Sequence, residues 1–160
     1  MTATNSLDEH ILQQAVDLAT ANVAAGGGPF GALVVRDGAV VATGVNRVTL
    51  ELDPTAHAEV TAIRAACREL GVFALTGCTL YTSCEPCPMC AASSLWARLD
   101  RVVFCANRHD AAEGGFDDRA FYELLTTPPQ GWPTAVQELR LHSADSPFRA
   151  WRDNPVRVDY

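Results

Sequence analysis

"CTLYTSCEPCPMCAASSLWARL", residues 78–99, decides the architecture because it begins as a short apolar strand and passes into a helix at Pro86. Three cysteines stand three residues apart at this junction: Cys84, Cys87 and Cys90. Cys87 and Cys90 share a helix face, and the positive amino end of the helix favours their thiolates, the form that binds a metal. Cys84 precedes the proline, so its side chain need not join that face. The stretch predicts a strand–helix unit of an α/β fold, with a thiolate pair where the helix begins.

The rest of the chain also alternates between strands and helices. A helix at 6–25 carries Asn22 on the same face as its apolar residues, and Asp37-Gly38 joins two β-rich runs in a hairpin. The remaining segments are a helix opened by Asp53-Pro54, a strand at 101–106, a helix at 118–125, a strand at 135–141 and a helix at 146–154. Because helices separate the later strands, these strands should be parallel. We expect a three-layer α/β/α sandwich with a five-stranded mixed sheet (N-terminal hairpin, later strands parallel), in a single domain over residues 1–160.

Composition narrows the class of function. The chain has 160 residues, of which 48% are apolar, enough for one sizeable core. A net charge of −7 and a pI near 4.9 disfavour nucleic acid as a partner, because its phosphates are bound by Lys and Arg. The first ten residues lack the basic and apolar regions of a secretory signal, and no apolar run is long enough to span a bilayer. We expect a cytoplasmic protein with six reduced cysteines that acts on a small molecule, not on nucleic acid or a membrane.

"TAHAE", residues 55–59, forms a second motif at the start of the preceding helix. In the first turn of a helix, His57 and Glu59 can both reach a point beyond the helix end, which suits a ligand with a nearby acid or base. Three kinds of site fit the cysteines: a redox dithiol, a structural zinc knuckle, or a catalytic zinc with three protein ligands and an open position. A redox dithiol leaves the second motif unexplained, and a structural zinc needs another cysteine pair, which the sequence lacks. The two motifs favour catalytic zinc, and a redox or zinc-binding module is the remote alternative.

The same motifs resemble a known superfamily. "PTAHAEVTAI" at 54–63 and "LYTSCEPCPMC" at 80–90 are similar to the cytidine-deaminase-like zinc-dependent deaminases, which carry H-x-E followed by P-C-x-x-C. Four further features resemble the small bacterial guanine deaminases of that superfamily: "GGPFGALVV" at 27–35, "HDAAEGGFDD" at 109–118, "SPFRAW" at 146–151 and a final Tyr160. The resemblance covers residues 5 to 160 and implies a cytidine-deaminase-like fold.

The resemblance also implies which residues are catalytic. The expected zinc ligands, for one ion per subunit, are His57, Cys87 and Cys90. Glu59 is the expected proton shuttle. Asp118 resembles the second carboxylate of the family, which faces the exocyclic amine of the substrate, and Asp117 beside it is a weaker candidate. Without the resemblance, Asp118 fits better as an N-cap for the helix that begins near Arg119.

A second group of residues is expected to bind the substrate: Phe30, Asn46, Ala58, Trp96 and Tyr160. Asn46 resembles the polar contact to the substrate ring. Phe30 and Trp96 resemble the residues that form the apolar walls of the family's site. The position of Ala58 resembles one whose backbone contacts the purine or the reacting oxygen. On their own, Phe30 and Trp96 also fit ordinary core aromatics, and Asn46 fits a cap at a strand end.

The activity that the resemblance implies is hydrolytic deamination of guanine to xanthine and ammonia by a zinc-activated water. Other aminated rings stay open as substrates, namely guanosine, ammeline or another triazine, and modified purines. Deamination of tRNA adenosine uses the same zinc motif, but the acidic composition weighs against it.

"SPFRAWRDNPVRVDY", residues 146–160, carries Phe148, Trp151 and Tyr160, a heavy apolar load for a chain end. Such a segment should be docked on something. In the resembling guanine deaminases it crosses to the partner subunit and closes that subunit's active site, with the final tyrosine over the bound base. We expect a homodimer with this segment swapped. The alternative is that Phe148 and Trp151 pack on their own subunit and Tyr160 is loose.

Overall fold

The computed structural model describes every residue except 1–5 and 117. Its contacts divide the chain into two units, one that ends at Tyr122 and one that spans Glu123–Tyr160. The first unit contains the sheet and every predicted metal ligand. The second unit contains the helix predicted near the end of the chain.

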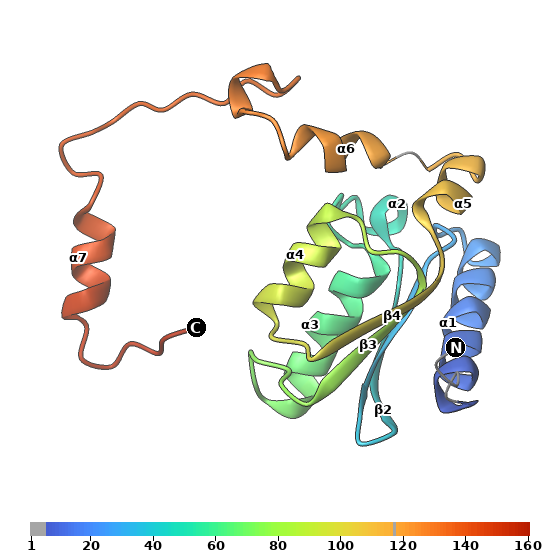
Figure 1. Ribbon diagram of the computed structural model, residues 1–160. Coiled ribbons are helices and arrows are strands. Elements are labelled where there is room, and N and C mark those ends of the chain that lie inside the picture. The colour runs from blue at the N-terminus through green and yellow to red at the C-terminus, as the bar shows by residue number, and fades with distance from the viewer. Residues whose placement is uncertain (1–5, 117) are drawn as a thin grey trace. The chain divides into compact units, whose positions relative to one another are not determined.

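Four strands form one mixed sheet in the order β2-β1-β3-β4 (Figure 1). They are β1 (Gly31–Arg36), β2 (Ala39–Val45), β3 (Cys78–Cys84) and β4 (Arg101–Ala106). β1 pairs antiparallel with β2 and with β3, whereas β3 and β4 are parallel. The predicted hairpin is confirmed: Asp37 and Gly38, with φ angles of 51° and 77°, make the turn between β1 and β2.

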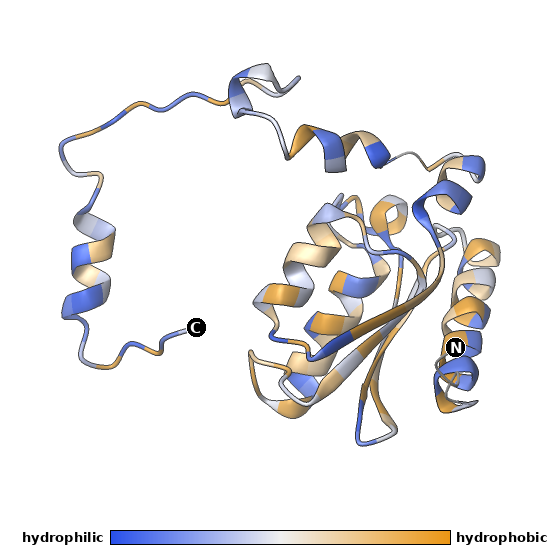
Figure 2. Ribbon diagram, in the orientation of Figure 1, coloured by the Kyte–Doolittle hydropathy of each residue, from blue (hydrophilic) through white to orange (hydrophobic). Residues whose placement is uncertain are grey.

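Helices cover both faces of this sheet, which gives the three layers expected from the sequence (Figure 1). On one face α1 (Ser6–Ala24) contacts β1 and β3, and on the other α3 (Ala58–Leu70) contacts β2 and β1 and lies beside α4 (Pro88–Trp96). Figure 2 shows that much of the length of the strands between these helices is hydrophobic (orange). Because β1 and β3 are covered on both faces, almost every residue in them is buried.

The prediction of a five-stranded sheet is wrong, because the sheet has four strands. Residues 135–141, the expected fifth strand, have no regular secondary structure and pair with none of the four strands. Leu139 and Leu141 in this segment are 81% and 61% exposed. A strand forms where a neighbour takes up its backbone hydrogen bonds and side-chain packing, and this segment has no such neighbour among the described residues.

The helix that carries the second motif begins later than the sequence suggested. Asp53 caps a local turn instead, in which its Oδ1 accepts hydrogen bonds from the backbone N–H and the hydroxyl of Thr55 at 2.8 and 2.7 Å. Helix α3 starts at Ala58, with His57 as its N-cap residue. The later start places His57 at the open end of the helix.

Short helices complete the chain. They are α2 (Val48–Glu51), α5 (Arg108–Glu113), α6 (Arg119–Leu124), a 3₁₀ turn at Pro129–Gly131 and α7 (Ser146–Asp153). Helix α5 was not predicted, although Asn107 and Asp110 form a capping box at its start. Within the second unit, the rings of Trp151 and Tyr160 meet edge to face at 6.1 Å. No helix in the described part of the chain has both the length and the apolarity to cross a membrane.

A polar cluster joins α1 to the two strands beside it. The Tyr81 hydroxyl of β3 donates to Asp8 Oδ1 at 2.5 Å, and Arg101 of β4 donates two hydrogen bonds to the same carboxylate at 3.0 and 2.5 Å. Chiefly through its hydrogen bonds, the Arg101 guanidinium holds the pKa of Asp8 below its usual range. The ion pair thus fixes the N-terminal end of α1 against the sheet.

Candidate metal centre

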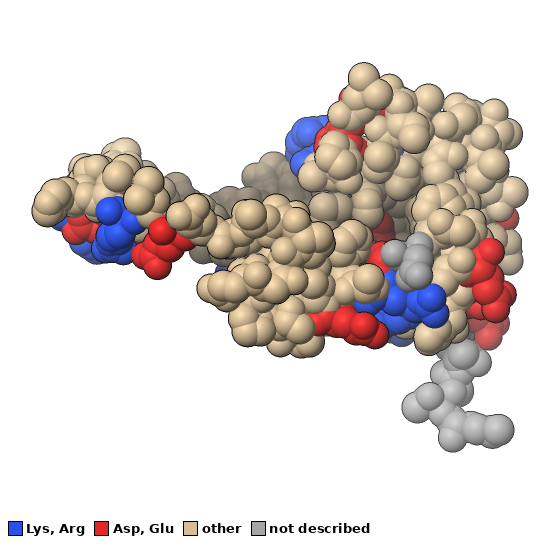
Figure 3. Space-filling view, turned by 90° about the horizontal axis from the view of Figure 1, so that it is seen from above, with Lys and Arg blue, Asp and Glu red and all other residues tan. Residues whose placement is uncertain are grey.

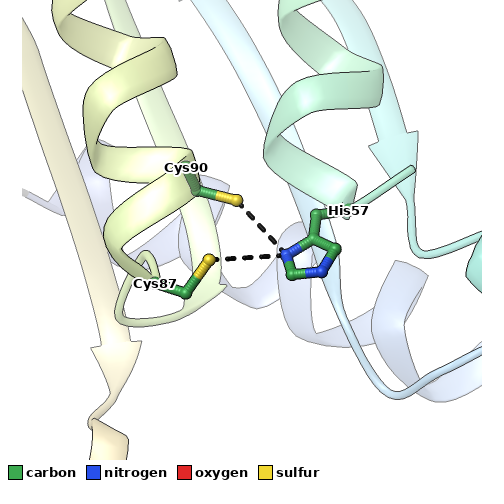
Figure 4. A group of neighbouring side chains, drawn as sticks. All are labelled: His57, Cys87 and Cys90. Atoms are coloured by element: carbon green, nitrogen blue, oxygen red, sulfur yellow. Dashed lines mark hydrogen bonds between the residues drawn. The ribbon is translucent and has the colours of Figure 1, made fainter. Parts of the chain in front are cut away.

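Three nitrogen and sulfur donors meet where two helices begin (Figure 4). His57 is the N-cap residue of α3, Cys87 is the N-cap residue of α4, and Cys90 lies in the first turn of α4. The His57 Nδ1 atom is 3.5 Å from Cys87 Sγ and 3.4 Å from Cys90 Sγ. One ligand atom from each residue lies within 4.8 Å of the others.

The electrostatics of this group favour a thiolate. Hydrogen bonds from the Cys90 thiol and from His57 lower the pKa of Cys87 to about 4. The hydrogen bond to Cys87 in turn raises the pKa of His57, because it favours the imidazolium. Hydrogen bonding to Cys87, together with burial, raises the pKa of Cys90, so one proton stays on that thiol.

This donor set fits zinc. Zinc binds imidazole nitrogen and thiolate sulfur, and a catalytic zinc has three protein ligands and an open position. Metal binding displaces the remaining thiol proton. The structure thus brings together the three ligands predicted from the sequence, from two segments 30 residues apart.

Cys84 lies outside the donor group. Its thiol is buried and directed at the carbonyl oxygen of Asn107, 3.8 Å away. Burial raises the pKa of Cys84 to about 11, so this thiol is neutral at physiological pH. It therefore packs beside the centre instead of joining it.

A cavity of about 380 Å³ opens next to the donors, within the usual size range of a small-molecule site. Its lining residues are Gly28, Phe30, Asn46, Val48, Thr49, His57, Glu59, Glu85, Cys87, Phe116 and Asp118. Glu59, in the first turn of α3, is only 6% exposed, and this burial raises its pKa. Burial also raises the pKa of Asp118. The buried Oδ1 atom of Asp118 has no hydrogen-bond partner among the described residues, so it is available to a ligand.

The structure brings some of the other predicted residues to this cavity and leaves others outside it. Phe30 and Asn46 line it. Ala58 is fully buried between His57 and Glu59, with no part in the lining. Trp96 ends α4 and is 64% exposed, away from the lining residues. Tyr160 belongs to the second unit. Asp117 lies outside the described residues.

Five lining residues were missed by sequence reasoning: Gly28, Val48, Thr49, Glu85 and Phe116. Phe116 lies in the quoted "HDAAEGGFDD" segment and meets Phe30 edge to face, with ring centroids 5.0 Å apart. Glu85 follows the carboxyl end of β3, which is where α/β sheets form their sites, so its position was a usable signal. Val48 and Thr49 lie on the short helix α2, for which the sequence offered no such signal.

An ion pair supports the loop that carries Cys87. Arg108 pairs with Glu85 at 2.5 Å, and its guanidinium lies 3.6 Å from the ring centroid of Tyr122. The Tyr122 hydroxyl donates to the carbonyl oxygen of Pro86. These contacts tie the residues just before α4 to α6, which begins directly after Asp118.

The chain is similar in sequence and in structure to known zinc-binding deaminases. Residues 5–106 match the cytidine and deoxycytidylate deaminase zinc-binding region. The chain is 50% identical over 153 residues to the guanine deaminase of Bacillus subtilis, which covers 95% of this chain and 98% of that one. An X-ray structure of the Bacillus subtilis guanine deaminase superimposes with a TM-score of 0.93, at 50% identity and the same coverage. A solved structure in complex with 2,6-diaminopurine gives a TM-score of 0.67 at 36% identity, over 69% of this chain and 62% of that one.

Proposed function

The chain belongs to the family of the cytidine and deoxycytidylate deaminase zinc-binding region, and we propose that it is a zinc-dependent aminohydrolase that converts guanine to xanthine and ammonia. One observation carries the proposal. A His/Cys/Cys donor set, the buried Glu59 and the half-buried Asp118 converge on one cavity, in a chain 50% identical to a guanine deaminase over 95% of its length.

His57, Cys87 and Cys90 would hold the zinc, and this single donor group would bind one ion in each chain. When bound there, zinc lowers the pKa of a coordinated water from about 15.7 to about 7 and so supplies the nucleophile at neutral pH. With three protein ligands, a fourth position on the ion would be open to that water. Every other step falls to residues of the chain.

Glu59 moves the protons. It accepts a proton from the attacking water and delivers it to N3 of guanine; once the water oxygen has bonded to C2, it takes the second proton from that oxygen and passes it to the amino group, which leaves as ammonia as the C2–N bond breaks. Its burial supports this role, because the raised pKa lets the carboxyl group hold a proton between transfers. Its position two residues after His57, in the first turn of α3, directs it to the same end of the helix.

Asp118 and Asn46 orient the purine. The buried Oδ1 of Asp118 accepts a hydrogen bond from the exocyclic amine and assists its departure. Asn46 contacts the ring, and Phe30 packs against the purine together with Phe116.

A small purine suits this chain better than a tRNA adenosine. The net charge is −7, and the basic side chains on the face drawn in Figure 3 lie in small groups beside acidic ones. Binding of RNA phosphates favours an extended basic surface. Guanosine, triazines such as ammeline, and modified purines are the nearest competing substrates.

The oligomer is a homodimer in which residues 146–160 are exchanged between subunits. The exposure of Phe148, Trp151 and Tyr160 supports this arrangement, because so many exposed aromatic side chains near one chain end indicate a docking partner. Exchange of an identical segment is a low-cost route to a two-fold dimer. All six cysteines are free thiols, which suits a cytoplasmic location.

The test is a panel of amine-bearing bases and nucleosides scored by ammonia release from the zinc-loaded protein. Guanine should have the highest kcat/KM. If guanosine, ammeline or an adenosine-bearing RNA has a higher kcat/KM than guanine, that compound is the substrate instead. If none of these compounds releases ammonia, the proposed deaminase function is refuted.

A further inference from the structure

Asn22 is a buried amide whose side chain no step of the proposed reaction uses. It lies in the last turns of α1 and is 5% exposed. Its Nδ2 group donates two hydrogen bonds, each 2.8 Å long, to the carbonyl oxygens of Gly28 and Asn46. Only the amide nitrogen supplies two donors to two carbonyls, so the orientation of the side chain is determined. Both acceptor residues line the cavity, and Asn22 itself does not.

The backbone at Gly27 packs closely against both Asn22 and Asn46. A Cβ atom on Gly27 would lie 2.6 Å from the Asn46 carbonyl oxygen, and closer still to the Asn22 amide nitrogen. The backbone N–H of Gly27 also donates a hydrogen bond to the backbone carbonyl oxygen of Asn22 at 2.9 Å. The end of α1, the glycine loop and the residue after β2 therefore form one close-packed unit, held by the Asn22 side chain.

This unit determines where the Asn46 carboxamide lies. The Asn46 Oδ1 atom accepts a hydrogen bond from the backbone N–H of Val48 at 3.3 Å. The other end of the carboxamide, Nδ2, makes no hydrogen bond within the described chain and is left to donate to an acceptor on the ring. A Cβ atom on Gly28 would lie 2.9 Å from the same Oδ1, so the glycine is what allows this position.

We propose that Asn22 is a positioning residue for purine binding, which acts through Asn46. It holds the Asn46 backbone and the glycine loop so that the Asn46 amide meets the ring in one orientation. The inference rests on the proposed purine site, because it gives Asn46 the ring contact described above. Fixing a binding group before the ligand arrives reduces the entropy lost on binding, so the effect should fall on substrate binding.

The main test is a double-mutant cycle of Asn22→Asp and Asn46→Ala, measured with guanine. Asp has nearly the shape of Asn, but its carboxylate can donate to neither carbonyl and its protonated form to only one, so the paired contact is lost in either form. The loss of a net interaction of about 1.4 kcal/mol corresponds to a tenfold rise in KM, and we expect kcat to change little. If Asn22 acts through Asn46, the double variant should have the KM of Asn46→Ala alone. Independent, additive increases in KM would overturn the proposal.

Tyr81→Phe is the matched control for general destabilisation. It removes a partly buried hydrogen bond between the opposite end of α1 and the sheet, at Asp8. The control should lower the melting temperature and leave KM for guanine unchanged. A rise in KM equal to that of Asn22→Asp would mean that any weakening of α1 has this effect, and the specific role would be refuted.

Gly28→Ala tests the same geometry in a variant expected to fold. The nearest atoms to its new Cβ belong to the Asn46 side chain, at 2.9 Å for Oδ1 and 3.0 Å for Cγ, so that side chain must move. We expect KM to rise with little change in melting temperature. An unchanged KM would count against the proposal, even if Asn22→Asp failed to fold.

Hydrogen–deuterium exchange separates this inference from the proposed function, because it needs no substrate. Asn22→Asp should speed exchange in segments 26–30 and 46–49 and leave the rest of the first unit as in the wild type. Exchange that is unchanged there would overturn the role of Asn22. If the wild type releases no ammonia from guanine, the proposed function fails, and the exchange result still decides whether Asn22 holds these segments.

Discussion

Replacing Glu59 with Gln removes the group that we propose carries every proton in the reaction. Gln has nearly the same shape and cannot accept a proton. General acid–base catalysis contributes about 10²–10⁴ to a rate for a single transfer. Because Glu59 serves several transfers, kcat should fall by more than about 10⁴, which corresponds to a barrier higher by about 5.4 kcal/mol.

The fold and the metal should survive this change. Glu59 is 6% exposed, and burial of its charged form is what raises its pKa. A neutral amide avoids the cost of burying a charge, so the melting temperature should not fall. Glu59 is also absent from the donor group, so zinc content should stay the same.

The assay is ammonia release from guanine, with zinc measured per chain on the same sample. Glu69→Gln is the matched control, because Glu69 is an exposed carboxylate on the same helix α3 and should leave kcat unchanged. A kcat within tenfold of the wild type in Glu59→Gln would refute the proton-shuttle role. Loss of zinc together with activity would show that Glu59 supports the metal centre instead.

Cys87→Ser should lose zinc and turnover while Cys84→Ser keeps both, measured as zinc per chain; equal zinc loss in the two variants would contradict the donor set. Asp118→Asn should lower kcat without loss of zinc, because its Oδ1 lies at the cavity with no hydrogen-bond partner among the described residues; a normal kcat would assign this residue a structural role. Removal of residues 156–160 should leave zinc content and the dimer intact in sedimentation and sharply lower guanine turnover; full activity would exclude the final tyrosine from the site. Asp8→Asn should lower the free energy of unfolding at pH 7 by about 1 kcal/mol, since the ion pair is partly exposed. Because the folded-state pKa of Asp8 is lowered, this difference should hold above the usual carboxyl value of 3.8 and shrink as the pH falls through the lowered value; a pH-independent difference in denaturant unfolding would argue against it.

Much of the site could be predicted from the sequence because its donors lie at helix starts, where local rules apply. Cys87 and Cys90 are three residues apart, and His57 and Glu59 share one helical turn. Residue spacing and chemistry predict what each pair does, without knowledge of where the other pair lies. The hairpin at Asp37-Gly38 was predictable for the same reason, since its turn depends on two adjacent residues.

The tertiary structure decided everything that depends on contacts between distant segments. The pairing of β1 with β3, and of β3 with β4, sets the frame in which α3 and α4 lie side by side and His57 meets the two thiols. The same frame brings Phe116 and the α2 residues to the cavity and lets Asn22 reach Asn46, 24 residues away. Residues 135–141 show the opposite case, because their local preference for a strand was not matched by a neighbouring strand. A few adjacent residues determine a local preference for a helix, strand or turn. A strand partner or a cavity wall exists only when separate segments bury their surfaces together.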